Sequence, residues 1–378
     1  MQWGRLSGAG RLGGIDLARG LAVLGMIAAH LLVLAPFDWS EPGTWLQVVD
    51  GRSSILFAVL AGLSIGLTTG GTHPVPAAAR PRARGRLAIR AVALWVLGIL
   101  LILTGVPVYV ILPAYAILFL LAMPLIGLRA GSLLVLAGAG LLVMPWVQAG
   151  LALLPFWDTV VGESVGVVIG WPYPFPLWVV FLTAGLALGR LDLRSTFVQG
   201  MLLLAGTGVA LVGYGIGGLL APVGDTEPQT YLELVTSMRA HSGGLPEAVG
   251  STGVAVAVIG ACLLLCRTPV RTLVWPLRAT GSMPLTAYTA QILVWAVWAL
   301  IALGDTGDLF AFRALEPFWP LTLGVVMGCT LWALFLGRGP LEELLDRLTR
   351  RIQRGVPGAS VSGTAAGERA RKAAPTDR

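Results

Sequence analysis

The sequence is poor in charge, cysteine and histidine. Of its 378 residues, 12% are charged, 3 are Cys and 3 are His, whereas 56% are hydrophobic and the mean hydropathy is +0.81. A soluble globular domain carries about 25% charged residues, so the low charge excludes that class. The composition indicates a polytopic membrane protein.

Several chemical signatures are also missing. The sequence contains no phosphate-binding loop, no GxGxxG motif after a strand and no Cys/His set with metal-ligand spacing, so no metal is expected. The three cysteines, Cys262, Cys266 and Cys329, all lie in apolar segments. No disulfide framework is therefore expected, and small apolar packing is their predicted role.

Apolar runs of about twenty residues, the length that a helix needs to cross a bilayer, recur along the chain. They predict an all-α integral membrane bundle of about ten transmembrane helices, with the lipid bilayer as its partner. The expected spans are 18–36, 53–70, 87–104, 108–127, 131–150, 173–189, 200–221, 249–266, 285–303 and 319–337.

The basic residues are distributed unevenly between the two expected faces. If the N-terminus is cytoplasmic, 23 of the 26 Lys and Arg residues fall on the inner side of ten spans, where positive residues near membrane ends are retained. The pattern predicts cytoplasmic termini and a multi-pass protein of the plasma membrane. The net charge of +7 then reflects topology and attraction to anionic lipid, and no nucleic-acid partner is expected.

The segments outside the spans differ in character. Residues 71–86 are rich in Pro and Arg and are predicted to form an exposed loop, and residues 151–172 are predicted to form an outer loop. The chain divides into a membrane domain over 1–337, an amphipathic cytoplasmic helix over 338–355 and a disordered basic tail over 356–378.

The first expected span carries a polar stripe in the stretch DLARGLAVLGMIAAH, residues 16–30. Arg19 and His30 project from the same face, because eleven helical residues make three turns plus about 20°, and Asp16 can form an i,i+3 ion pair with Arg19. Arg19 and Asp16 could simply anchor the helix at the inner surface. His30 could be a hydrogen-bonded interior residue or a general base near physiological pH.

The stretch RLGGIDLARGLAVLGMIAAH, followed by FAVLAGLSIGL, resembles the N-terminal signature of the transmembrane acyltransferase superfamily. It is similar above all to the branch of heparan-α-glucosaminide N-acetyltransferase and the bacterial YeiB-like proteins. The spacing of Arg19 and His30 also matches the Arg-x10-His motif of the acyltransferase type 3 branch. The heparan branch has Asn at the position of His30 and a catalytic His in the first outer loop, whereas residues 37–52 contain no His here.

This resemblance implies a 1–337 acyltransferase-like domain that moves an acyl group, in the first place acetyl, from cytoplasmic acetyl-CoA to an outer hydroxyl or amine. The expected acceptor is a carbohydrate or glycolipid. His30 would be the base, with Arg19 and Asp16 completing the catalytic set. The cations for the coenzyme phosphates would be Arg19, Arg86, Arg90 and Arg278.

Two further polar groups stand beside the expected spans. Arg52, Asp50 and His241 are candidates for binding the acceptor on the outer side, although solvated loop charges explain them equally well. The segment SMPLTAYTAQ opens a late span, where Ser282 is expected to cap the helix. Its polar residues could bond the pantetheine amides or join helices.

Two alternatives to an enzyme remain at this stage. A secondary transporter would place interior polar residues around a solute, and a non-catalytic scaffold would use His30 only for stability. The sequence leaves open the acceptor, the length of the acyl chain and whether the protein forms a homo-oligomer.

Overall fold

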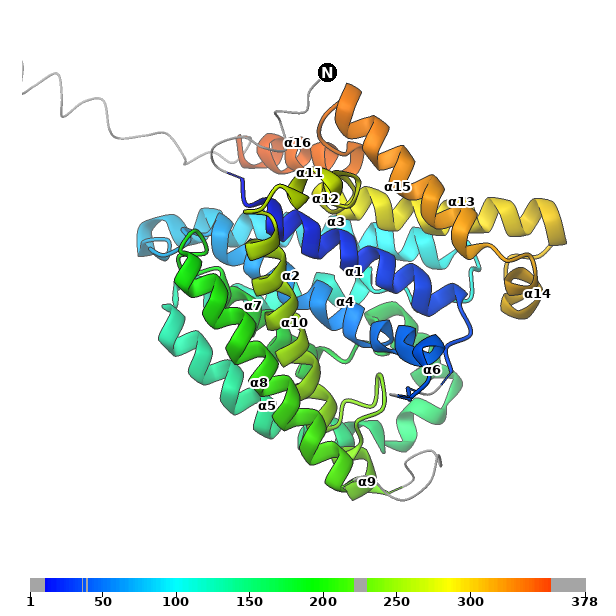
Figure 1. The fold of residues 1–378 in the computed structure, drawn as a ribbon, viewed down its shortest axis with the longest axis horizontal. Coiled ribbons are helices and arrows are strands. Elements are labelled where there is room, and N and C mark those ends of the chain that lie inside the picture. The colour runs from blue at the N-terminus through cyan, green and yellow to red at the C-terminus, as the bar shows by residue number, and fades with distance from the viewer. Residues whose placement is uncertain (1–10, 36, 39, 221–229, 355–378) are drawn as a thin grey trace, which may run out of the picture.

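The computed structural model describes residues 11–35, 37–38, 40–220 and 230–354. These residues form α-helices and short 3-10 helices, and no strand occurs among them (Figure 1). The disordered tail predicted over 356–378 lies outside the described residues. The predicted class, an all-α multi-pass membrane bundle, is confirmed.

Eight helical segments are long and apolar enough to cross a membrane. Two further expected spans, 108–127 and 173–189, correspond to the shorter apolar helices α4 (Leu112–Ala122) and α7 (Phe175–Leu188). The long segments contain α1 (Gly13–Leu31), α2 (Arg52–Thr68), α3 (Arg80–Ile102), α5 (Ala130–Ala152), α8 (Thr196–Leu220), α10 (Leu245–Leu265), α13 (Pro284–Leu303) and α15 (Phe318–Phe335).

Shorter helices fill the connections between these segments. They are α6 (Val160–Ile169), α9 (Tyr231–Thr236), α11 (Val270–Leu273), α12 (Trp275–Ser282), α14 (Leu309–Ala314) and, after the last span, α16 (Pro340–Arg354). The 3-10 helices are η2 (Pro42–Val49), η3 (Ala77–Ala79), η4 (Leu125–Gly127) and η5 (Pro155–Asp158).

Two expected loops contain helix instead. The predicted loop 71–86 is wrong in its second half, because α3 begins at Arg80 with a proline in its first turn, a position where proline needs no hydrogen bond. Arginine is also a good helix former. The predicted outer loop 151–172 contains η5 and α6, and the Thr159 side chain caps α6 by accepting a bond from the backbone of Gly162.

Glycines bring the central helices into close contact. A Cβ atom at Gly62 of α2 would lie 1.9 Å from the Leu182 carbonyl oxygen of α7, and one at Gly281 of α12 would lie 1.8 Å from the Asp16 carbonyl oxygen of α1. Such approaches are possible only without a side chain, as in many membrane helix pairs. The α1–α12 contact fixes the turn of α1 that carries the first charged residues.

Helix α16 packs against α3 and α13 (Figure 1). Its Glu342 carboxylate accepts bonds from the backbone N–H groups of Leu285 and Thr286, at 2.8 and 3.1 Å, and from the Thr286 hydroxyl. The expected cap by Ser282 is wrong, because Ser282 ends α12 and donates to the Ala279 carbonyl oxygen. The start of α13 is therefore capped by a residue 57 positions away from Leu285.

Candidate active site

The charged residues of α1 form a bonded group at the beginning of the helix. The Asp16 carboxylate is 3% exposed and accepts from Arg11 Nε at 2.5 Å and from Arg19 Nη1 at 3.3 Å. The other guanidinium nitrogen, Arg19 Nη2, donates to Ser64 Oγ of α2 at 2.6 Å. The expected i,i+3 ion pair is present, and Ser64 adds a second tether that orients the Arg19 side chain.

Arg19 lines a cavity of about 360 Å³ between α1, α2, α3, α4, α13 and α16. One end of this cavity is charged. We call it the arginine-rich end, and its charged wall consists of Arg11, Arg19, Arg90, Arg338, Glu342 and Asp346. The rest of the wall is mostly apolar, so the cavity changes from a charged entrance to a hydrophobic interior.

Asp346 of α16 holds two of the arginines at this end. Its carboxylate lies 2.6 Å from Arg90 Nη2 and 3.0 Å from Arg338 Nη1. An adjoining hollow of about 440 Å³ shares Arg90 and Asp346 and is also lined by Arg82, Arg86 and Arg350. Helix α3 presents its arginines at i, i+4 and i+8 to this hollow, because the segment expected to be a loop is helical. Arginines therefore outnumber the carboxylates around Asp346.

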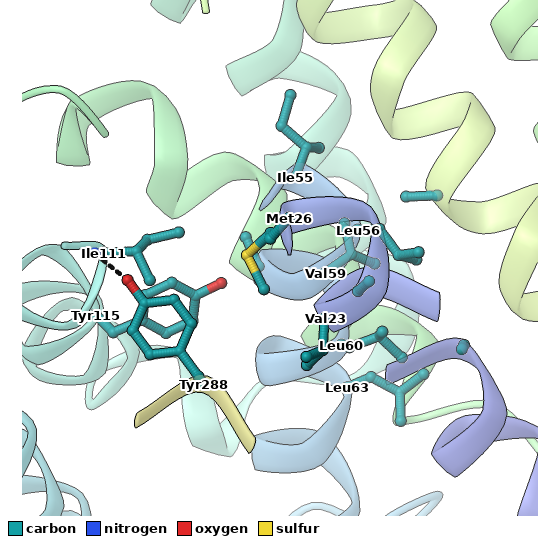
Figure 2. Packing of buried hydrophobic residues seen from close by; sticks show 14 of the residues in the cluster. Val23, Met26, Ile55, Leu56, Val59, Leu60, Leu63, Ile111, Tyr115 and Tyr288 are labelled. Atoms are coloured by element: carbon teal, nitrogen blue, oxygen red, sulfur yellow. Dashed lines mark hydrogen bonds between the residues drawn. The ribbon is translucent and has the colours of Figure 1, made fainter. Parts of the chain in front are cut away.

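The opposite end of the cavity is formed by two tyrosines and apolar side chains. Tyr115 and Tyr288 line this end together with Phe57, Leu60 and Leu112. The Tyr288 hydroxyl accepts a bond from the Ile111 backbone at 3.2 Å, whereas the hydroxyl of Tyr115 is buried without a hydrogen-bond partner in the described structure. Figure 2 shows the Tyr115 hydroxyl directed toward Met26 of α1.

His30 does not line the cavity. Met26, one helical turn before His30, is 4% exposed and packs among apolar residues of α2 (Figure 2). The His30 carbonyl oxygen accepts from Arg313 Nη2 at 2.8 Å, and its ring atom Nδ1 is buried without a hydrogen-bond partner in the described structure. Arg19 and His30 share a helix face, but only Arg19 reaches the cavity.

Asp50, Arg52 and His241 come together near the end of α1 that carries His30. His241 Nε2 lies 3.6 Å from Asp50 Oδ1. The ionisable side chains whose charges act on the His30 ring are His241, Asp50 and Arg313. Arg52 does not pair with the Asp50 carboxylate among the described contacts. It donates instead to Tyr214 Oη at 2.8 Å and to backbone carbonyls.

The His241 backbone is held in a strained conformation with φ of 63°. Its N–H donates to Glu247 Oε1 at 2.6 Å, and the other oxygen of this buried carboxylate accepts from the Gly243 N–H at 2.6 Å. Partial loss of hydration opposes protonation of the His241 ring, but the neighbouring carboxylates of Asp50 and Glu247 outweigh it and raise the pKa of His241. We call Asp50, Arg52, His241 and Glu247 the His241 cluster.

The structure separates the four arginines expected to hold the coenzyme. Arg19 and Arg90 line the cavity, Arg86 lines only the adjoining hollow, and Arg278 lines neither. Arg278 packs against Gly13 instead, where it joins α12 to α1. The sequence reading missed Ser64, Tyr115 and Arg338. Tyr115 gave only a weak signal, as a hydroxyl within the apolar run LPAYAILFLL.

Within the described ranges, no group of three or more His, Cys, Asp or Glu side chains could hold a metal ion.

Two family profiles together match residues 11–352 of the chain. A family profile described as heparan-alpha-glucosaminide N-acetyltransferase, catalytic, matches residues 11–214, which is more than half of the chain. A second profile, described as a protein of unknown function (DUF418), matches residues 200–352 and so includes α16. No match was found among curated proteins or solved structures. The chain belongs to the heparan-alpha-glucosaminide N-acetyltransferase catalytic family, in the transmembrane acyltransferase branch that includes the YeiB-like proteins.

Proposed function

We propose that the protein transfers an acetyl group from acetyl-CoA, bound at the arginine-rich end, to a hydroxyl or amine of an acceptor at the opposite side of the membrane. The observation that carries this proposal is the cavity of about 360 Å³, which begins among arginines and ends at apolar and phenolic side chains. Acetyl-CoA has the same polarity, with phosphates at one end and an uncharged thioester at the other.

The arginines fit the phosphate-bearing part of this donor. Guanidinium groups bind phosphate oxygens through paired, charge-assisted hydrogen bonds. Arg19 and Arg90 line the cavity itself, and Arg86 lines the adjoining hollow, where the nucleotide part has room outside the cavity. Arg278 contacts Gly13 at the start of α1 and lines neither of these two hollows, so its expected role in binding the coenzyme has no support from them and stays a prediction from the sequence.

His30 is the proposed general base. The acceptor oxygen or nitrogen attacks the thioester carbon, His30 takes the proton of the attacking group, and the carbon–sulfur bond breaks. The proton then returns from the imidazole to the coenzyme sulfur, so that the products are the acetylated acceptor and free CoA. An unpartnered ring nitrogen at His30 suits this role, since no hydrogen bond within the described structure has to be broken first.

We propose that Met26 separates the cavity from His30, because it lies one helical turn before His30 and the Tyr115 hydroxyl points toward it (Figure 2). A helix rises about 1.5 Å per residue, so His30 lies about 6 Å farther along α1 than Met26. Methionine is unbranched and adapts its shape readily. Displacement of this side chain would open the cavity toward His30 and bring the thioester and the base together.

The acceptor side is proposed to be the His241 cluster. Carboxylate, guanidinium and imidazole groups lie next to one another there, and such groups bind sugar hydroxyls. This favours a carbohydrate or glycolipid acceptor. The concentration of Lys and Arg residues on one side of the expected spans further supports a plasma-membrane protein with the arginine-rich end in the cytoplasm.

Binding of acetyl-CoA to the purified protein in detergent tests the proposal. The wild type should bind, and Arg19→Ala should bind about ten- to a hundredfold more weakly, because a hydrogen bond to a charged group contributes about 1.5–3 kcal/mol. Arg129→Ala, which removes an arginine that lines neither hollow, is the matched control and should bind normally. A folded wild type that binds no acetyl-CoA would overturn the proposal and favour a solute transporter.

A further inference from the structure

The hydroxyl of Tyr115 stands out among the buried tyrosines. Tyr115 is 3% exposed, and its oxygen has no hydrogen-bond partner in the described structure. By contrast, Tyr173 donates to the Tyr109 carbonyl oxygen at 3.0 Å, and Tyr288 and Tyr214 are bonded as well. A buried hydroxyl without a partner costs about 1–3 kcal/mol. Such a cost is expected where a ligand supplies the missing partner.

The Tyr115 ring has little freedom to turn away. It contacts Phe57 edge-on at 5.7 Å between ring centroids and Phe119 at 6.5 Å. Both neighbours also line the cavity, so the aromatic contacts fix the ring at the cavity wall. The hydroxyl is therefore held in place before any ligand binds, as a donor must be to act without reorganisation.

The position of Tyr115 matches the uncharged end of the donor. Along α2, Ser64 contacts Arg19 and Phe57 contacts Tyr115. These two residues of α2 are seven positions apart, which corresponds to about 10 Å of helix. A donor whose phosphates lie at the arginine-rich end thus carries its thioester toward Tyr115, and Leu60 and Leu112 supply apolar surface for an acetyl methyl group.

On the basis of the proposed function, we infer that the Tyr115 hydroxyl donates a hydrogen bond to the carbonyl oxygen of the bound thioester. When the acceptor attacks, its oxygen or nitrogen bonds to the carbonyl carbon and the carbonyl oxygen gains negative charge. The Tyr115 hydroxyl stabilises this charge and keeps its own proton. Collapse of the intermediate re-forms the carbonyl and breaks the carbon–sulfur bond, and the proton from the acceptor passes through His30 to the sulfur.

Tyr115→Phe is the decisive variant, because it keeps the ring and its aromatic contacts. We expect kcat to fall about a hundredfold, the usual effect of losing one donor to a developing oxyanion, with a much smaller change in KM for acetyl-CoA. The melting temperature of the ligand-free protein should not fall, since the change removes an unpaired hydroxyl. Tyr231→Phe is the control, because its hydroxyl donates to the Trp146 carbonyl oxygen away from the cavity and its loss should leave kcat unchanged.

A second readout does not depend on turnover. With acetyl-CoA labelled with ¹³C at the carbonyl, the infrared stretch of the bound thioester should lie at lower frequency in the wild type than in Tyr115→Phe, because a hydrogen bond weakens the carbonyl bond. An unchanged stretch and an unchanged kcat, in an enzyme that binds acetyl-CoA, would overturn the role of Tyr115 alone. A raised KM with unchanged kcat and stretch would move the contact to the pantetheine arm and also overturn it. Absence of acetyl-CoA binding to the wild type would instead overturn the proposed function itself.

Discussion

The two polar regions of this protein differ in how their charges are satisfied. At the arginine-rich end, Asp346 is shared between Arg90 and Arg338, and further arginines line the same two hollows. In the His241 cluster, each charged group is tied to a neighbour, as Arg52 is to Tyr214 and Glu247 is to the backbone of His241. An excess of cations around a cavity favours an anionic ligand, whereas a cluster closed by its own hydrogen bonds favours a neutral one.

The two regions also differ in access. The arginine-rich end opens into a cavity, whereas His30 does not line that cavity. The cavity proposed for the donor and the residue proposed as the base are therefore separate. The proposed transfer accordingly requires a movement that connects them.

The largest expected effect comes from replacing His30. This variant tests whether acetyl-CoA binding and proton transfer depend on different regions of the protein. His30→Ala should lower the transfer rate by about 10²–10⁴-fold, the usual contribution of a general base, and leave acetyl-CoA binding near the wild-type value. The measurement combines single-turnover acetyl transfer with binding by calorimetry. Equal loss of binding and transfer would show that the two regions are not separate.

A medium effect on stability is expected from the cap between α16 and α13. Glu342→Ala removes the acceptor of two backbone N–H groups and should destabilise the protein by about 1–2 kcal/mol, as for other helix caps. Thermal unfolding in detergent measures this. Glu343→Ala is a suitable control, because the Glu343 carboxylate pairs with exposed arginines, namely Arg347 and Arg350 of its own helix and Arg338 just before it. Equal shifts for both variants would contradict a special role for the cap.

A smaller effect, a gain rather than a loss of acetyl-CoA affinity, is expected from replacing Asp346. Asp346→Asn keeps the shape of the side chain but releases Arg90 and Arg338 from its charge. Acetyl-CoA should then bind a few-fold more tightly, since the phosphates no longer compete with a carboxylate. If the Asp346 carboxylate competes with the phosphates for the arginines, the difference in acetyl-CoA affinity between Asp346→Asn and the wild type should become smaller at higher salt. Weaker binding by Asp346→Asn would mean that the carboxylate orients the arginines rather than competing for them.

The smallest effect is a pH dependence in the His241 cluster. Because the pKa of His241 is raised in the folded state, its pairing with Asp50 contributes stability that is fully present below the unfolded value of about 6.5. The contribution is lost as the pH rises through the higher folded value. The side chain is 43% exposed, so solvent screening should keep the effect below about 1 kcal/mol.

The check is the melting temperature of the wild type and of Asp50→Asn between about pH 5 and 8.5. The two curves should converge as the pH rises. His241→Asn is a useful second variant, since Asn tolerates the positive φ of this position better than most residues. A difference that grows with pH would contradict the assigned direction.

Much of the fold could be read from the sequence because the bilayer imposes a strong local rule. Each crossing needs a long apolar helix, so hydropathy alone was sufficient for the all-α class and for the approximate positions of ten apolar helices. It missed α6, the apolar helix in the segment expected to be an outer loop. The ion pair of Asp16 with Arg19 also follows from helix geometry, since residues three apart share a face. The family resemblance rested on residues 11–30, which include most of α1, and on the segment FAVLAGLSIGL of α2.

Other features depended on contacts between distant segments. Three of them join residues that are far apart in the chain. They are the cap of α13 by Glu342, the ion pair between Asp346 and Arg90, and the part of the cavity lining that contains Tyr115. Periodicity places a side chain on a face of its helix but does not say which partner that face meets. The sequence by itself determined the membrane class and the polar face of α1. The tertiary structure decided that Arg19 lines a cavity and that His30 does not, because packing between helices sets where space remains.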